Sequence, residues 1–445
     1  MSGARVTVVG AGLGGSLMAI TLGRAGHEVA LFERRPDPRE GVHSGGRSIN
    51  LAISTRGLHA LGQVGLERTI LDMSVPMRGR MIHRADGRRT FQPYGTAPHH
   101  AIRSVSRTDL SLALLGVAAQ ERNISLHFEK RCTSVDLEVP SATFACAAGG
   151  PPLTVRSQVI VGADGAFSRV RLQMQRNGRF DYQQAFLEHG YKELTIPPAP
   201  GGGFALEENA LHIWPRGGYM MIALPNLDRS FTCTLFWPFH GPNSFAALRR
   251  PAEVLDFFQH RFPDTVPLMP DLVEEYLGHA TGSLVTVRCR PWHHEDRAVL
   301  IGDACHAVVP FYGQGANAAF EDCVVLGECL ARHGTDWEHA FAEFESLRRG
   351  HVNILADLAL SHFVEMRDRT ASRLFLGRKA LERGLYRLFP GWFIPLYSMV
   401  TFSRIPYGLA VRKARRQWRT VAMVLAAGLL AMMVLMLAMF RARRP

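Results

Sequence analysis

The chain has 445 residues and a mass of 49.3 kDa, a length at which a single hydrophobic core no longer grows, so more than one domain is expected. Hydrophobic residues make up 47% and charged residues 20% of the chain, which argues against a mainly disordered protein. The 51 basic and 39 acidic residues give a formal net charge of +12, which admits a nucleic acid, a membrane surface or an anionic ligand as partner. The seven cysteines are odd in number and form no C-x-x-C pair, which argues against a disulfide framework and a zinc ribbon, so reduced thiols and no metal ligands are expected.

The N-terminal segment has the pattern of a dinucleotide-binding unit. Residues 5–10 form an apolar run that leads into Gly10-Ala-Gly12-Leu-Gly14-Gly15, and a helical pattern follows. The first glycine permits a tight turn, the second lets the backbone approach a pyrophosphate, and Gly15 lets the helix pack closely on the strand. A second apolar run, residues 28–32, ends at Glu33, where a carboxylate would hold a ribose hydroxyl. The pattern predicts an adenine dinucleotide, either NAD or FAD.

Two later motifs distinguish the two cofactors. Residues 159–162 form an apolar run that ends in Asp164-Gly165, and residues 298–302 form another that ends in Gly-Asp303. A second glycine turn, Gly313-Gln-Gly315-Ala316-Asn317, then begins a helix. With the first motif, this set resembles the flavin-dependent aromatic hydroxylases. The resemblance implies that FAD is the bound cofactor, that Asp303 holds its ribitol, and that the helix after Gly315 directs its positive N-terminus at the flavin, where it would stabilise the reduced anionic form.

Several shorter segments resemble one family within this group, the kynurenine 3-monooxygenases. They are residues 46–54, 76–83, 93–96, 104–107, 211–215, 231–235 and 393–404. The resemblance extends from about residue 5 to the C-terminal segment. It implies hydroxylation of L-kynurenine to 3-hydroxy-L-kynurenine, a step of tryptophan degradation towards quinolinate and NAD, with O2 and NADPH as co-substrates. The sequence has no second G-x-G-x-x-G for the nicotinamide cofactor, so transient binding is expected, and the choice of NADPH over NADH rests on the family alone.

The resemblance also implies roles for individual residues. The substrate contacts are Arg80, Tyr94, His362 and Tyr397. The cofactor contacts are Gly10, Gly12, Gly14, Gly15, Glu33, Arg34, Arg35, Ala52, Arg107, Cys132, Asp164, Asp303, Gly315, Ala316 and Asn317. No catalytic side chain is expected, because FAD carries the oxidising chemistry. The family has Asn at the position of His362, and a histidine offers both a donor and an acceptor only as the appropriate neutral tautomer.

The predicted fold is α/β, with a Rossmann-like FAD-binding domain interrupted by a second domain. Alternating patterns and turn residues between the second and third motifs predict an inserted antiparallel-sheet substrate domain, residues 181–284. The FAD-binding domain then comprises residues 1–180 and 285–345. Helical patterns predict a C-terminal region, residues 346–415, that closes the active site.

Residues 421–440 are uncharged and apolar over a length of roughly 30 Å as a helix, enough to span a bilayer. A buried core helix is the alternative, but it would normally carry a polar stripe. Five basic residues precede the segment and three follow it, which favours a cytoplasmic body anchored in the bacterial inner membrane or, in a eukaryote, the mitochondrial outer membrane. These charges account for most of the basic excess, and no nucleic-acid partner is expected.

Three other functions share part of this pattern. Another FAD-dependent aromatic hydroxylase would carry the same three motifs. A flavin amine or amino-acid oxidase would share the first motif and Glu33, but the Asp-Gly and Gly-Asp motifs favour a hydroxylase. A non-catalytic membrane-tethered flavoprotein would have no need of Arg80, Tyr94 and Tyr397.

Overall fold

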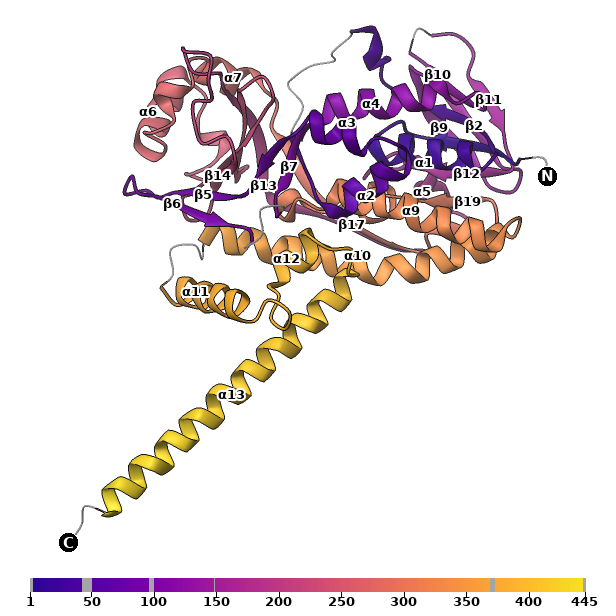
Figure 1. The fold of residues 1–445 in the computed structure, drawn as a ribbon. Coiled ribbons are helices and arrows are strands. Elements are labelled where there is room, and N and C mark those ends of the chain that lie inside the picture. Colours follow the sequence, from indigo (N-terminus) through magenta and orange to yellow (C-terminus); the bar gives the residue numbers. More distant parts are fainter. Residues whose placement is uncertain (1–2, 42–49, 96–99, 148, 369–372, 443–445) are drawn as a thin grey trace. The chain divides into compact units, whose positions relative to one another are not determined.

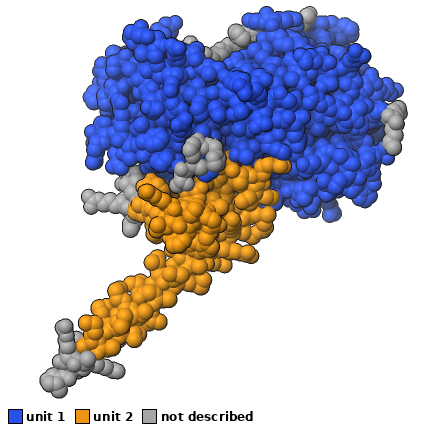
Figure 2. Space-filling view, viewed as in Figure 1, with its two compact units in different colours: residues 1–371 blue, residues 372–445 orange. Residues whose placement is uncertain are grey.

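A computed structural model describes residues 3–41, 50–95, 100–147, 149–368 and 373–442. The chain divides into two compact units, residues 1–371 and residues 372–445 (Figure 2). Parts of the sequence motifs at 46–54 and 93–96, and the basic residues Arg443 and Arg444, lie outside the described residues. All seven cysteines are free thiols.

The first sheet of unit 1 carries the dinucleotide motif (Figure 1). Its strand order is β18-β19-β12-β1-β2-β8. The strands are β1 (Arg5–Val9), β2 (Glu28–Phe32), β8 (Ile124–His127), β12 (Val159–Gly162), β18 (His293–His294) and β19 (Ala298–Leu300). All pairs except β18·β19 are parallel, so the carboxyl ends of β12, β1 and β2 meet at one edge. Their apolar runs follow from burial on both faces of the sheet.

Five main helices accompany this sheet: α1 (Leu13–Arg24), α2 (Thr55–Gln63), α4 (Arg107–Gln120), α9 (Gly315–His333) and α10 (Trp337–Asp368). α9 packs against α1, α2 and α10. Glycine permits the closest of these approaches, because a Cβ on Gly57 of α2 would lie 2.4 Å from the Asn317 Oδ1 of α9. α9 therefore fixes the positions of the surrounding helices.

The second sheet has the order β17-β13-β16-β15-β14-β5-β6. Its strands are β5 (Gly79–His83), β6 (Arg89–Pro93), β13 (Asp181–Ile196), β14 (Ala210–Pro215), β15 (Met220–Pro225), β16 (Phe231–Pro238) and β17 (Gly282–Arg290). Its pairs are antiparallel except β14·β5. The predicted boundaries stay a prediction, but residues 79–93, assigned from sequence to the FAD-binding domain, lie in this sheet because β5 pairs with β14 far along the chain.

One face of the second sheet packs against α6 (Pro251–Arg261) and α7 (Leu272–Gly278). The aromatic side chains of Trp214, Phe231, Trp237, Phe258 and Phe262 are at most 1% exposed in the core between them. Burial of such large side chains stabilises this domain and makes its sheet a rigid support for β5.

The other elements of unit 1 are short. One small sheet contains β9 (Lys130–Asp136), β10 (Ser141–Cys146) and β11 (Leu153–Arg156), and another contains β3 (Asn50–Ile53), β4 (Val75–Met77) and β7 (Ile102–Ser106). The short helices are α3 (Glu67–Asp72), α5 (Arg169–Met174), α8 (Asp303–His306) and the 3-10 helix η4 (Pro310–Tyr312).

Unit 2 consists of α11 (Arg373–Leu388), α12 (Leu396–Thr401) and α13 (Tyr407–Ala442). Residues 407–439 of α13 are long and apolar enough to cross a membrane, and only 6% of the apolar window is buried. The predicted span, residues 421–440, is the C-terminal part of a longer helix. The reason is that no proline occurs within α13, so the basic segment before the span continues the same helix.

Candidate active site

A groove with a volume of about 980 Å³ begins at the carboxyl edge of the first sheet. Near β1 and β2 it is lined by Gly12, Glu33 and Arg35, and Arg107 of α4 lies on the same groove. Farther along it reaches Ser104 and the turn after β15 in the second sheet. Ligands of parallel α/β sheets bind at this kind of edge, and the elongated groove suits an extended dinucleotide.

Glu33 is at the end of β2 and is 8% exposed. Its Oε2 accepts a hydrogen bond from the backbone N–H of Ala11 (3.1 Å), and its Oε1 accepts from the Arg35 Nε (2.8 Å). These bonds hold the carboxylate against the glycine turn, while the groove remains open beside it. A ribose hydroxyl can donate to the remaining lone pairs of such a carboxylate.

The glycine turn forms a cradle at the N-terminus of α1. Gly10 has φ of +102°, a backbone conformation that favours glycine. A Cβ on Gly15 would lie 1.9 Å from the Gly10 carbonyl oxygen, so only glycine allows this approach of helix to strand. A Cβ on Gly12 would meet no atom within 4 Å and would project into open space. The N–H groups of the first turn of α1 therefore face a space that fits a pyrophosphate.

Asp303 is the first residue of α8 and is solvent-exposed. Desolvation by the surrounding protein raises the pKa of its carboxyl, opposed by the nearby positive charges of His306 and Arg107. Among the residues that the structure describes, no side chain or backbone group forms a hydrogen bond with this carboxylate. Hydroxyl donors of a ribitol would satisfy it, so Asp303 fits the predicted cofactor.

Asn317 joins two segments around the predicted flavin position. Its Oδ1 accepts from the backbone N–H of Ser54 (2.9 Å), and its Nδ2 donates to the carbonyl oxygens of Ala52 (2.9 Å) and Gly313 (2.8 Å). The side chain is 1% exposed. Asn317 therefore orders the end of β3 at residues 52–54 and the turn before α9 at residues 313–315 through its side chain, and a cofactor would be contacted by the backbone of these segments.

A buried ionic cluster supports the same region from behind. Asp322 of α9 accepts from the His306 Nε2 (2.5 Å), the Gly302 backbone N–H (3.0 Å) and the Arg348 Nε (2.8 Å). Burial alone would raise the pKa of Asp322, but His306 and Arg348 outweigh it and hold that pKa below its usual value. Arg348 also pairs with Glu321, which pairs in turn with Arg56 of α2. The cluster therefore fixes the turn that presents Asp303.

Cys305, His306 and Asp322 lie close enough together to hold a metal ion, and all three are buried. The hydrogen bond from His306 and the positive charge of Arg348 already neutralise Asp322. We therefore interpret this group as part of the ionic cluster, in keeping with a structural role for His306.

Three predicted cofactor residues have other surroundings. Cys132 of β9 is 8% exposed, and burial raises the pKa of its thiol to about 12. Arg34 is exposed. Asp164 accepts backbone hydrogen bonds from Arg169 and Val170 through Oδ2, whereas its buried Oδ1 has no partner among the described residues. Desolvation raises the pKa of Asp164, so a donor at this oxygen would stabilise the ionised form.

The predicted substrate residues of unit 1 form a second cluster. The Arg80 Nη2 of β5 lies 3.0 Å from the His362 Nε2 of α10. Because a guanidinium only donates, Nε2 must accept, which assigns the neutral tautomer with the proton on Nδ1. The Arg80 guanidinium carbon is 5.5 Å from the centre of the Tyr94 ring, and Tyr94 is 8% exposed. The Tyr312 ring of η4 is 5.0 Å from the His362 ring.

Apolar aromatic side chains continue this cluster. The Phe311 ring of η4 stacks on Phe363 of α10 at 4.1 Å and meets Phe236 of β16 edge-on at 4.9 Å. The arrangement places one cation beside an aromatic surface, which suits an aromatic amino acid with a carboxylate. Tyr397 is the second residue of α12 in unit 2, and its predicted contact with the substrate stays a prediction.

Sequence reasoning did not assign a role to the polar network that lines the far end of the groove. The Asn50 Nδ2 donates to the Ser104 Oγ (3.1 Å) and to the Pro225 carbonyl oxygen (3.2 Å). The Asn226 Nδ2 donates to the Ser230 Oγ (2.9 Å). Asn50 and Ser104 stood only within the resembling segments 46–54 and 104–107, without a role. The turn residues at 226–228 predicted a turn but did not indicate that Asn50 lies beside it.

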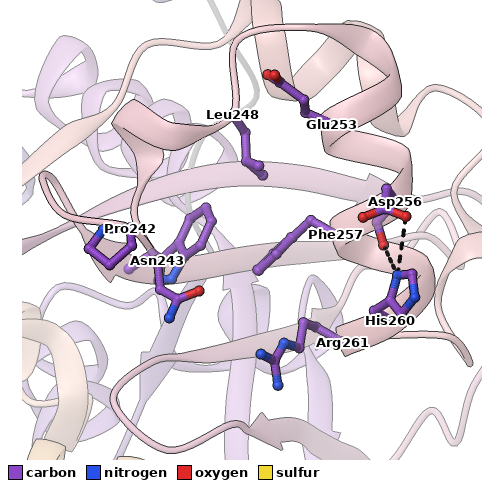
Figure 3. A pocket seen from close by; sticks show the side chains of 9 residues that line it. Pro242, Asn243, Leu248, Glu253, Asp256, Phe257, His260 and Arg261 are labelled. Carbon is purple, nitrogen blue, oxygen red and sulfur yellow. Dashed lines mark hydrogen bonds and ion pairs between the residues drawn. The ribbon is translucent and has the colours of Figure 1, made fainter.

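A second hollow, of about 540 Å³, lies on the β-sheet domain near α6 (Figure 3). Its lining includes Trp237, Phe257 and the pair Asp256–His260. None of the predicted site residues lines it.

Comparison with known proteins identifies the family. The sequence model of the family described as "FAD binding domain" matches residues 3–229 and 268–352. The Myxococcus xanthus protein named "Kynurenine 3-monooxygenase" is 51% identical over 405 residues, which cover 91% of this chain and 87% of that protein. The protein of the same name from Salinispora arenicola is 50% identical, with 96% of this chain and 95% of that protein covered.

Solved structures show the same fold at lower identity. A tetrameric form of 2-methyl-3-hydroxypyridine-5-carboxylic acid oxygenase has a TM-score of 0.67 at 20% identity, covering 90% of this chain and 96% of that one. The Pseudomonas aeruginosa protein PqsL, in complex with 2-aminobenzoylacetate, has a TM-score of 0.65 at 20% identity, covering 82% and 97% of the two chains. The family match and the sequence identities show that this chain is an FAD-dependent monooxygenase of the kynurenine 3-monooxygenase family.

Proposed function

We propose that the protein hydroxylates L-kynurenine to 3-hydroxy-L-kynurenine, with NADPH as reductant and O2 as the source of the oxygen atom. The balanced reaction consumes kynurenine, NADPH, a proton and O2, and yields 3-hydroxykynurenine, NADP⁺ and water. The observation that carries the proposal is the 51% identity to a protein named kynurenine 3-monooxygenase over 87% of that protein's length.

FAD would contact the protein at three points, of which Glu33 and Gly12 line the groove. The Glu33 carboxylate would accept from the ribose of the adenosine half, and the N-terminus of α1 beyond Gly12 would bind the pyrophosphate. Asp303, whose raised pKa reflects an unfavourable environment for a bare carboxylate, would accept from the ribitol hydroxyls. When bound, FAD supplies the electron transfer to O2 and the oxygen transfer that amino-acid side chains cannot provide.

The side chains of this chain bind and orient the substrate. Arg80 would bind the kynurenine carboxylate by charge-assisted hydrogen bonds, with Tyr94 beside it. His362 accepts from Arg80 and so restricts the orientation of the guanidinium. The stacked pair Phe311–Phe363 would contact the aniline ring and exclude water. The amino group of the substrate activates the adjacent ring carbon, so no side-chain base is required.

We also propose that α13 anchors the protein to a membrane, with unit 1 on the cytoplasmic side. The support is the exposed apolar length of α13 and the excess of basic residues before the span over those after it. NADPH would bind transiently, because the sequence has no second nucleotide motif.

The test is substrate-stimulated oxidation of NADPH by the purified full chain. The flavin should be released by acid precipitation, because the family resemblance offers no side chain for a covalent link. L-kynurenine should stimulate NADPH oxidation, and 2-aminoacetophenone, which has the same aniline ring without the amino-acid group, should bind far more weakly. An enzyme that retains its flavin but shows no kynurenine stimulation would contradict the proposal.

A further inference from the structure

The net charge of the protein is confined to unit 2. Residues 372–445 contain 14 of the 51 basic residues and one of the 39 acidic residues, so this unit carries +13. Residues 1–371 contain the other 37 basic and 38 acidic residues and carry −1. A partner that recognises the positive charge of this protein must therefore bind unit 2.

Four of these 14 basic residues lie on one face of α13. The exposed residues Arg412, Arg415, Arg416 and Arg419 recur at helical spacing, and the opposite face carries the buried residues Ala410, Ala414 and Gln417. At about 1.5 Å per residue, Arg412 is roughly 14 Å from Val421, where the apolar segment begins. This distance is about the thickness of the headgroup layer of a bilayer plus one Debye length, so these arginines lie within electrostatic reach of the lipid phosphates.

A group of exposed apolar side chains lies close to the basic part of α13, beside Gln417 and Trp418. At the end of α11, Leu388 is 72%, Phe389 is 53% and Trp392 is 45% exposed. These three residues form the α11 tip. Large apolar side chains clustered at this exposure mark an interaction surface.

The α11 tip is fixed to α13 by contacts within unit 2. The Gln417 Nε2 donates to the Trp392 carbonyl oxygen (2.6 Å). The Phe393 ring meets the Trp418 ring edge-on at 5.5 Å, and Trp418 is three residues before Val421. The Arg378 guanidinium of α11 lies 5.0 Å over the same Trp418 ring. The tip is therefore held near the point where the apolar segment starts, and aromatic residues at such a point are typical of a membrane interface.

We propose that unit 2 binds anionic phospholipid in addition to spanning the bilayer, with the α11 tip inserted at the boundary between headgroups and acyl chains. The arginines of α13 and the exposed Arg383 and Arg387 of α11 contact the lipid phosphates. Lipid is favoured over nucleic acid because the basic face adjoins both an exposed apolar tip and an apolar helix, which a nucleic acid would not cover. This inference rests on the proposed anchor and is independent of the proposed substrate.

The experiment places the full chain in nanodiscs and measures quenching of tryptophan fluorescence by brominated lipids. Brominated phosphatidylglycerol and brominated phosphatidylcholine are compared at the same mole fraction, and Trp392→Phe identifies the signal of the tip. Both lipids should quench Trp392, and the anionic lipid should be enriched at least fivefold near it. A fivefold enrichment corresponds to about 1 kcal/mol, the effect of a single basic residue near the surface.

Replacing Arg412, Arg415, Arg416 and Arg419 together by Gln should reduce the enrichment, while Arg383 and Arg387 retain part of it, and should leave the quenching by phosphatidylcholine unchanged. The matched control replaces four exposed arginines of unit 1 by Gln: Arg68, Arg122, Arg156 and Arg176. The control should retain the enrichment.

Three results would overturn the proposal. Identical quenching of the wild type and Trp392→Phe would show that the tip is not in the bilayer. Equal quenching by the two lipids, together with single-stranded RNA binding that the fourfold Gln variant loses, would assign the basic face to nucleic acid. Failure of the full chain to co-elute with nanodiscs would contradict the proposed membrane anchor as well. The proposed kynurenine hydroxylation would be unaffected by that result, because it is tested by a separate turnover assay.

Discussion

Replacing Arg80 by Ala removes the cation that we assign to the kynurenine carboxylate. Two charge-assisted hydrogen bonds from a half-buried guanidinium contribute on the order of 2–4 kcal/mol to binding, so the Michaelis constant for kynurenine should rise roughly 30- to 1000-fold. The variant also loses the 3.0 Å bond to His362 and the contact with Tyr94, at a cost of about 1–2 kcal/mol in stability. The FAD content should not change, because the groove at Glu33 is formed by other elements.

The assay combines steady-state NADPH oxidation at varied kynurenine with a flavin absorbance spectrum and a melting temperature. Arg216→Ala is the matched control. This arginine is also half-buried, lies 5.0 Å over Phe262, and donates to the His83 carbonyl oxygen (3.0 Å). It should lower the melting temperature to a similar extent and leave the Michaelis constant unchanged. A folded, flavin-containing Arg80→Ala enzyme with an unaltered Michaelis constant would refute the assignment.

Asp303→Asn should weaken FAD binding about 10- to 100-fold, as expected for loss of a charged acceptor, and equal affinities by titration of flavin-free protein would contradict this. The folded-state pKa of Asp303 is raised, so ionisation of this carboxyl destabilises the flavin-free wild type as the pH rises through that pKa. Asp303→Asn cannot ionise, so the melting temperature of the flavin-free variant should fall less than that of the flavin-free wild type between about pH 4 and pH 7. Arg348→Met breaks the buried ionic cluster and should cost about 3–5 kcal/mol in urea unfolding, whereas the exposed Arg68→Gln should stay within about 0.5 kcal/mol. A chain ending at Thr420 should be soluble without detergent and retain FAD, and a chain ending at Arg415 should melt at a lower temperature because it lacks the contacts that hold the α11 tip. Full-length protein that is soluble without detergent would argue against the anchor.

Local patterns were sufficient to predict four strands of the first sheet, β1, β2, β12 and β19, and the glycine turn after β1. The apolar run before Gly10 reflects the burial of β1 on both faces of the sheet. Glu33 follows the carboxyl end of the neighbouring strand β2. These features depend on residues within about thirty positions of one another, so the sequence displays them directly. The long apolar segment of α13 is predictable for the same reason.

Contacts between distant segments could not be predicted from the residues alone. Nothing near Arg56 indicates that its guanidinium pairs with Glu321, and nothing near Arg348 distinguishes it from the many exposed arginines of this chain. The contact between Arg80 and His362 joins residues 282 positions apart and depends on the parallel pairing of β5 with β14. The resemblance to a family indicated Arg80, whereas the tautomer of His362 follows only from the geometry.

The most direct test of the central claim is the fate of oxygen from ¹⁸O2. Purified, flavin-containing enzyme is supplied with L-kynurenine, NADPH and ¹⁸O2, and the products are analysed by mass spectrometry. We predict 3-hydroxy-L-kynurenine that carries one ¹⁸O atom, formed in proportion to the NADPH oxidised. Oxidation of NADPH that yields hydrogen peroxide and leaves kynurenine unchanged would contradict the account.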